Sequence, residues 1–244
     1  MNAITRGGIE FIAVLFGLSI SLWIDNNAKE NELKVQNKKI LNRLYHNLQA
    51  DSTDGVWNYK AYERGIKGSE NVIKWCDSNP TLSSIDDSIE KDISAMMIAT
   101  IFVHNEEEYI ALKNSGRTDL ITNEDLVIKL HDYYTRIDFI KTLDAFQNDY
   151  VRTHVAPYLS DYADENLYNK EDINSIVYKN FPKIRLYRMP DIKKMRLYAT
   201  SMLTWQRYTQ SLYKGQIRRV TEIRKLLREE LDFKTTMVNN SSEI

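Results

Sequence analysis

The stretch that decides the fold is Ile9–Ile24, IEFIAVLFGLSISLWI, in which Glu10 is the only charged residue. Extended back by five residues it covers 21 residues and takes in Arg6. About 20 helical residues cross a hydrocarbon core of ~30 Å. We therefore expect a transmembrane helix over residues 1–25, with Arg6 and Trp23 as anchors at its two membrane interfaces.

Two other interpretations of this stretch remain open. A cleaved signal peptide also has a basic start and an apolar core, but the exit Trp23–Asn27 has no small-residue pair before a cleavage site. A buried core helix is compatible with the strictly uncharged run, because that run is shorter than a full span. Its length and its aromatic end favour the membrane anchor.

Small residues and one acid form a pattern inside the span. Ala13, Gly17 and Ser21 recur every four residues, a spacing that lets two helices approach closely in lipid. Glu10 lies near the same face, and a carboxylate in lipid usually faces a bundle interior, water or a partner. The pattern predicts a self-associating anchor with an intramembrane acid. Alternatively, Glu10 lies at the interface and pairs with Arg6 one turn earlier.

Composition predicts an all-α fold around this helix. The 244 residues include only 8 Gly and 4 Pro, fewer than the turns of β-sandwiches and Rossmann folds require. A formal net charge of -1 excludes a strongly basic nucleic-acid binder. A single cysteine, Cys76, excludes an internal disulfide and a zinc site built from cysteines.

The chain beyond the anchor divides into three predicted parts. Residues 26–52 contain no Pro or Gly and predict a stalk or a short coiled coil that continues the first helix, with a turn or kink at Asp51–Gly55. Residues 53–233 predict a bundle of long helices. Residues 234–244 predict a polar, frayed tail.

Within the predicted bundle, periodicity and helix stop signals place six helices. Asn79-Pro80 ends the first, Asn105 and either Thr122 or Asn123 are candidate N-caps, and Gly116 is a candidate C-terminal residue. The expected apolar face of the fourth helix includes Tyr133 and Phe146. The expected ranges are 55–78, 83–102, 106–115, 122–156, 171–179 and 191–231.

Searches for chemical motifs indicate no catalytic, cofactor-binding or metal-binding residue. The sequence contains no phosphate-binding glycine loop, no H-E-x-x-H zinc motif and no G-x-S-x-G elbow. His104 precedes three glutamates, but adjacent helical residues point in different directions, so a solvated first turn is the better interpretation. Cys76 is more typical of a buried structural thiol than of a nucleophile.

Two groups of residues resemble a bacterial family of single-pass membrane proteins known only as a domain of unknown function. One group is Gly8–Glu10 with Trp23–Asn27; the other is Glu108–Gly116, Asp119–Ile121 and Leu130–Tyr134. Ile9 departs from the family's adjacent Gly-Glu pair. The resemblance implies a membrane anchor, a helical domain and a cytoplasmic N-terminus, which would place the domain in the periplasm. It implies no activity.

The function expected from these features is that of a non-enzymatic scaffold, sensor or interaction module at the bacterial inner membrane. The expected partners are the lipid bilayer, further copies of the chain and other envelope proteins, but no nucleic acid. Four lysines after the span instead favour a cytoplasmic domain, so the side of the membrane stays open. The alternative function is a channel or ion-coupled subunit in which Glu10 lines a pathway.

Overall fold

The computed structural model describes residues 3–116, 118, 121–163 and 184–241. Side chains are described for these residues except 3–10, 13 and 233–241. The fold is all-α, as expected, and the described residues include no β-strand. The helices are α1 (Ala3–Asp77), η1 (Leu82–Ser84), α2 (Asp87–Met96), α3 (Glu107–Asn114), α4 (Glu124–Tyr150), the π-helix η3 (Val151–Val155), α5 (Ala156–Ser160) and α7 (Ile192–Ser241).

The chain forms two compact units that interleave in sequence. Unit 1 contains Met1–His46, Glu107–Val127 and Leu226–Ile244, and unit 2 contains Asn47–Glu106 and Ile128–Lys225. The long helices α1 and α7 each contribute one end to unit 1 and the other end to unit 2.

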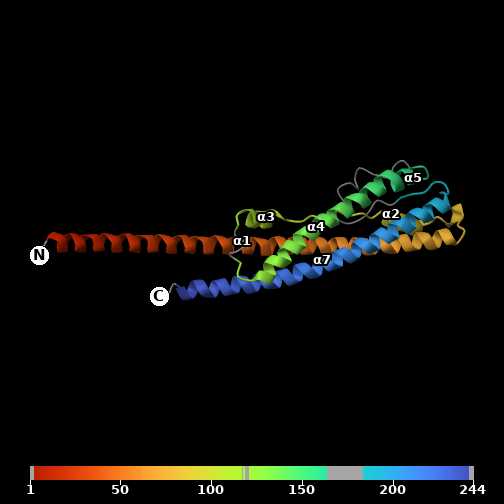
Figure 1. The fold of residues 1–244 in the computed structure, drawn as a ribbon. Helices are drawn as coiled ribbons and strands as arrows, with labels where there is room; N and C mark the ends of the chain where they lie inside the picture. Colours follow the sequence, from red (N-terminus) through yellow and green to blue (C-terminus); the bar gives the residue numbers. More distant parts are fainter. Residues whose placement is uncertain (1–2, 117, 119–120, 164–183, 242–244) are drawn as a thin grey trace. The chain divides into compact units, whose positions relative to one another are not determined.

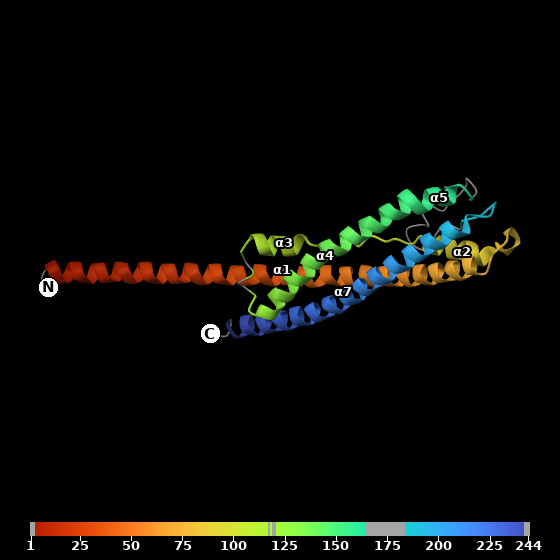
Figure 2. The same cartoon turned by 45° about the vertical axis from the view of Figure 1, so that its right-hand side comes forward.

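Three helices form the framework of unit 2. There α7 runs antiparallel to α1. At one end Arg196 Nε is 2.6 Å from Asp77 Oδ1, and at the other end the guanidinium nitrogen Nη2 of Arg224 is 3.2 Å from Gln49 Oε1. The helix α4 lies beside both (Figures 1 and 2). Its Gln147 donates to the Trp205 carbonyl oxygen at 3.2 Å.

The buried positions of these three helices alternate in steps of three and four residues. This spacing is that of a heptad repeat, in which one stripe of each helix faces its neighbours. The buried stripe in unit 2 consists of Leu48, Asp51, Gly55, Asn58, Tyr62, Gly65, Ser69, Val72 and Cys76 on α1; Leu130, Tyr133, Ile137, Ile140, Asp144 and Gln147 on α4; and Met195, Ala199, Met202, Gln206, Thr209, Tyr213, Gln216, Val220 and Ile223 on α7.

One end of unit 2 has an apolar core. Ile93 and Met96 of α2 are fully buried there, with Val72 of α1, Val155 of η3 and Met202 of α7. A close approach between α2 and α1 makes this packing possible. A Cβ atom added at Gly68 would lie 2.7 Å from Ala95 Cβ and 2.7 Å from the Asp92 carbonyl oxygen.

Unit 1 includes α3 and the start of α4. Asn123 accepts a hydrogen bond from the Leu126 N–H at 3.1 Å and caps α4, one of the two residues expected to do so. Gly116 follows α3 with φ 65°, the left-handed conformation expected of it. The buried Glu230 carboxylate accepts from both the N–H and the hydroxyl of Thr122, at 2.8 Å and 2.9 Å.

Several predicted boundaries are wrong. The helix α1 continues through Asp51–Gly55 without the expected turn, because these residues make tertiary contacts described below. The helical path does not end before Pro157, because it continues from α4 through the π-helix η3 into α5, which has Pro157 in its first turn. The helix α7 extends to Ser241, into the expected frayed tail. The short helix predicted over 171–179 lies outside the described residues.

Candidate functional site

A non-helical segment, residues 98–106, lies in the middle of unit 2 and replaces the last five residues of the helix predicted over 83–102. Its contacts run along α1 in the reverse direction, from Gly65 beside Ile98 to Asp51 beside Asn105. The fourteen residue steps between Asp51 and Gly65 cover about 21 Å of helix axis. The segment spans this length in the seven steps from Ile98 to Asn105, about 3 Å each, so it is nearly fully extended. We call residues 98–106 the extended segment.

Side chains of the extended segment alternate between the core and the surface. Ile98, Thr100 and Phe102 are buried, whereas Ile101 and Val103 are 67% and 65% exposed. This period of two is that of a β-strand, but no second strand pairs with it among the described residues. Its backbone groups must therefore find side-chain partners, because a buried and unpaired amide is costly.

Carboxylates of α1 and α4 accept hydrogen bonds from the segment's N–H groups. The Phe102 N–H donates to Asp144 at 3.0 Å, the Val103 N–H to Asp54 at 3.0 Å and the Asn105 N–H to Asp51 at 2.9 Å. The Thr100 N–H donates to the Tyr62 hydroxyl at 3.3 Å.

Side-chain amide and hydroxyl groups donate hydrogen bonds to the backbone carbonyl oxygens. Gln206 Nε2 donates to the Met96 and Ile98 oxygens at 2.8 Å and 3.1 Å, and its Oε1 accepts from the Ser69 hydroxyl at 2.8 Å. Asn148 Nδ2 donates to the Thr100 oxygen at 2.8 Å. These contacts explain why the helix stripes that face the segment are polar.

Asp144 is the centre of the first polar cluster. Its carboxylate is buried and accepts from the Tyr213 hydroxyl at 2.7 Å as well as from the Phe102 N–H. The Tyr62 hydroxyl lies 3.4 Å from it and donates to Gln147 Oε1 at 2.8 Å. Burial raises the pKa of Asp144 to about 6, although the hydrogen bonds from Tyr213, Phe102 and Tyr62 lower it.

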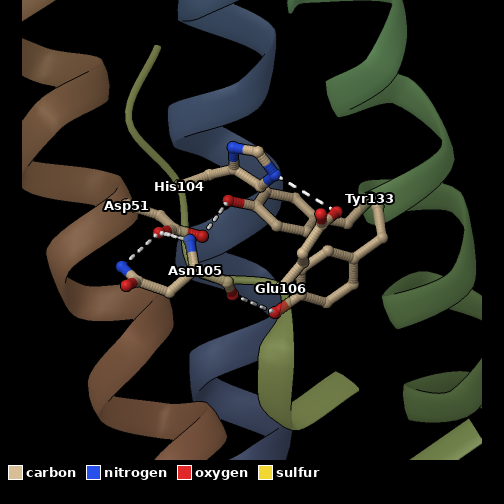
Figure 3. A network of polar contacts seen from close by, with 6 residues as sticks. Asp51, His104, Asn105, Glu106 and Tyr133 are labelled. Carbon is tan, nitrogen blue, oxygen red and sulfur yellow. Dashed lines mark hydrogen bonds and ion pairs between the residues drawn. The ribbon is translucent and has the colours of Figure 1, made fainter. Parts of the chain in front are cut away.

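The second polar cluster holds Asn105 (Figure 3). Asp51 accepts from the Asn105 N–H and from its side-chain amide, at 2.9 Å and 3.1 Å, and from the Tyr133 hydroxyl at 2.8 Å. The Tyr134 hydroxyl donates to the Asn105 carbonyl oxygen at 3.2 Å. His104 Nε2 lies 3.2 Å from a Glu106 carboxylate oxygen. Burial raises the pKa of Asp51, against the hydrogen bonds from Tyr133 and Asn105.

The side chains of both clusters hold the extended segment in place through hydrogen bonds. Burial, with the nearby Asp144 and Asp51 charges, raises the pKa values of the Tyr213 and Tyr133 hydroxyls, so these groups stay protonated and act as donors. Burial likewise raises the pKa of the Cys76 thiol to about 11. Among the described residues, no group of three or more His, Cys, Asp or Glu side chains could hold a metal ion.

The residues predicted to act in a membrane lie at the other end of the chain, in unit 1. Gly17, Ser21 and Trp23 are on α1 and exposed. A Cβ atom added at Gly17 would meet nothing within 4 Å in this chain. The side chains of Arg6, Glu10 and Ala13 lie outside the described residues, so the predictions about an intramembrane acid and an Arg6 anchor stay predictions.

Large apolar side chains surround this part of α1 on every side. We call them the apolar collar, and all are between 48% and 66% exposed. They are Phe11, Ile12, Val14, Leu15, Phe16, Leu18, Ile20, Leu22, Trp23 and Ile24. No helix in the described ranges is both long and apolar enough to cross a membrane, so the transmembrane span expected above is not supported.

Comparisons with known proteins add no relative. The chain matches no protein-family model, no curated protein and no solved structure. The resemblance to a family of single-pass membrane proteins therefore stays a prediction.

Sequence reasoning missed the two polar clusters. Tyr62 and Tyr213 are fully buried, whereas a boundary position is the usual expectation for tyrosine in a helical bundle. The burial of Tyr133 agrees with its place on the predicted apolar face of the fourth helix. Phe146, which we expected in the core, is 50% exposed. Its ring packs against the Trp205 ring, and the two ring centroids are 5.0 Å apart. The sequence feature that could have revealed the clusters is the regular spacing of three and four residues along each helix, which continues through polar positions.

Proposed function

We propose that the protein is a non-enzymatic scaffold, sensor or interaction module held at a membrane by the N-terminal end of α1. In this proposal the apolar collar is embedded in lipid, and the helical remainder of the chain lies outside the bilayer and meets other envelope proteins. The bacterial inner membrane is the expected location, with the side of the helical domain left open.

The observation that carries the proposal is the exposure of the apolar collar. An ordinary surface helix hides its apolar side chains in one stripe against the core. Here consecutive residues such as Val14, Leu15 and Phe16 are all exposed, so every face of the helix is apolar. A helix that is apolar all round belongs in a core or in a membrane. In the part of unit 1 that the structure describes, these side chains all stay exposed.

The membrane part of the proposal is tested by flotation with phosphatidylcholine vesicles. The full chain should float with the vesicles, and a double variant Phe16→Asp and Leu18→Asp should stay at the bottom of the gradient. The matched control is Ile128→Asp with Leu197→Asp, since these side chains are equally exposed, at 66% and 62%, but lie outside the collar. Failure of the wild type to float, or loss of flotation in the control, would refute membrane attachment through the collar.

Self-association through Ala13, Gly17 and Ser21 is the second part of the proposal. Since Gly17 contacts nothing in its own chain, Gly17→Leu should leave the fold intact and reduce cross-linking between copies in vesicles. Ser19→Leu, on another face of α1, is the control and should leave cross-linking unchanged. A strictly monomeric wild type would rule out this part while leaving membrane attachment untouched.

A further inference from the structure

The extended segment is held mainly by polar contacts. Only Ile98 and Phe102 bury large apolar side chains, while Ile101 and Val103 face the solvent. Its other attachments are the hydrogen bonds to side chains of α1, α4 and α7 described above. A segment with few buried apolar contacts can open locally at a lower free energy than the surrounding helices unfold.

The partners of its N–H groups are mostly carboxylates that lie in the core while the segment is closed. Asp144 is 1% exposed and Asp51 is 1% exposed. Opening the segment would remove the Phe102 and Asn105 N–H donors and let water reach both carboxylates. Since burial penalises a charge, a buried carboxylate binds a proton more readily than a hydrated one.

The titratable groups that face Asp144 are two phenols and one carboxylic acid. They are Tyr62 and Asp54 from α1 and Tyr213 from α7. Asp54 adds repulsion, whereas the tyrosines donate hydrogen bonds that only partly offset the cost of burial. Asp51 faces Tyr133 from α4 and His104 from the extended segment, and burial is again the largest effect.

A protonated Asp144 still fits its surroundings. A carboxyl protonated at Oδ1 keeps Oδ2 as a carbonyl oxygen that accepts from both the Phe102 N–H and the Tyr213 hydroxyl. Its new O–H can donate to the Tyr62 hydroxyl oxygen 3.4 Å away, since that hydroxyl gives its own proton to Gln147. Proton binding therefore removes the cost of a buried charge without removing the contact that holds the segment.

We propose that the extended segment is a proton-coupled latch, which closes more firmly onto α1, α4 and α7 as the solution becomes more acidic and opens locally, before the bundle unfolds, as the solution becomes more alkaline. Opening uncovers the polar faces of three helices and the sites of Ile98 and Phe102. The latch thus makes access to the middle of unit 2 depend on pH.

The size of the effect follows from Asp144. With a pKa of 3.8 for the carboxyl in water and about 6 in the closed state, the closing equilibrium strengthens about tenfold between pH 8 and pH 5. The sign is fixed by linkage: the closed state takes up a proton, so lower pH favours it.

Amide hydrogen exchange of the full chain in detergent micelles tests the latch. Exchange rates are corrected for the intrinsic effect of pH and compared between the Phe102 amide and the Tyr213 amide in the middle of α7. We expect the Phe102 amide to exchange through a local opening whose protection rises about tenfold from pH 8 to pH 5, relative to Tyr213. Equal protection of both amides at every pH would overturn the proposal, because the segment would then open only with the whole bundle.

Substitutions test whether Asp144 is the residue that binds the proton. Asp144→Asn should remove the tenfold part of the pH dependence of Phe102 protection that comes from Asp144 and leave only the part from Asp51, whereas Asp138→Asn, at an exposed acid on α4, should retain the full dependence. Should Asp144→Asn fail to fold, Tyr213→Phe provides the second test, since it removes one donor from the carboxylate and should increase segment opening at pH 8 more than at pH 5. A tenfold pH dependence that persists in Asp144→Asn, or an effect of Tyr213→Phe that is equal at both pH values, would refute the assignment.

Discussion

Replacing Gly68 by alanine should destabilise unit 2 through a backbone clash. Alanine is normally the better helix residue, so an exposed Gly→Ala change in a helix stabilises by about 1 kcal/mol. At Gly68, however, the added Cβ would lie 2.7 Å from Ala95 Cβ, 2.7 Å from the Asp92 carbonyl oxygen and 3.0 Å from the Met96 nitrogen. Two of these three atoms belong to the α2 backbone and cannot turn away as a side chain would.

The expected loss is the cost of displacing α2 minus the gain in helix propensity. Carbon atoms pack best at about 3.5–4.0 Å, so α2 must move by roughly 1 Å. Overpacking of this kind costs about 1–3 kcal/mol. Since Ile93 and Met96 of α2 are fully buried in the apolar core, we place the cost at the upper end and the net destabilisation at about 1–2 kcal/mol.

Gly215→Ala is the matched control, because it makes the same chemical change in α7. Its added Cβ would meet only the Arg219 guanidinium, at 3.1 Å, and this flexible group can move aside. We expect a stabilisation of about 1 kcal/mol, so the two variants should differ by about 2–3 kcal/mol. At roughly 2–4 °C per kcal/mol for a chain of this size, their thermal midpoints should differ by about 4–12 °C.

Thermal and urea unfolding followed by circular dichroism measure this difference in the full chain. Adding Ala95→Gly to Gly68→Ala should restore only part of the stability, because it removes one of the three close contacts and leaves the two with backbone atoms. Equal midpoints for Gly68→Ala and Gly215→Ala would show that α2 does not pack as closely on α1 as the structure indicates.

Four further predictions concern the polar clusters and the helix ends. Gly65→Ala should loosen the extended segment, because its Cβ would lie 2.7 Å from the Gln206 side-chain nitrogen; faster amide exchange at Ile98 would show this, and unchanged exchange would contradict it. Cys76 should resist alkylation at pH 8 until urea unfolds the chain, since its thiol is buried and its pKa is raised to about 11; rapid labelling of the folded protein would contradict this. Asn123→Ala should lower stability by about 1 kcal/mol through loss of the α4 cap, which urea unfolding would detect, whereas Asn123→Asp should preserve the cap. Asp144→Asn should remove about 1.4 kcal/mol of the stability that the wild type gains between pH 8 and pH 5, because the folded pKa of Asp144 lies above its unfolded value; an unchanged pH profile of the urea midpoint would contradict the raised pKa.

Local signals were sufficient for the fold class and for several helix ends. The scarcity of Gly and Pro predicts helices, and the structure is all-α. Asn79-Pro80 predicts the end of α1, which ends at Asp77, and Asn79 adopts a positive φ of 53°. These features succeed because a helix end depends on the few residues around it.

The extended segment could not be predicted in the same way. Ile85, Ile89, Ile93 and Met96 recur with helical spacing, and the helix predicted over 83–102 extends this pattern to Ile101. In the structure Ile101 faces the solvent, and the buried side chains at 98, 100 and 102 follow a period of two instead. The segment leaves the helix because its backbone finds partners on three other helices, which lie 29 to 108 residues away in the sequence.

The polar stripe of α1 shows why the candidate site stayed hidden. Asp51 and Gly55 suggested a turn, since an acid and a glycine within a helix usually weaken it. Both lie in the same heptad stripe as Leu48 and Tyr62, so the helix is continuous, and Asp51 and Tyr62 bind the extended segment from its inner face. Each carboxylate there compensates for a strand partner that the segment lacks. A polar interruption in an otherwise regular heptad stripe is therefore evidence for a non-helical neighbour, and Asp144 of α4 and Gln206 of α7 interrupt their stripes where they bind the same segment.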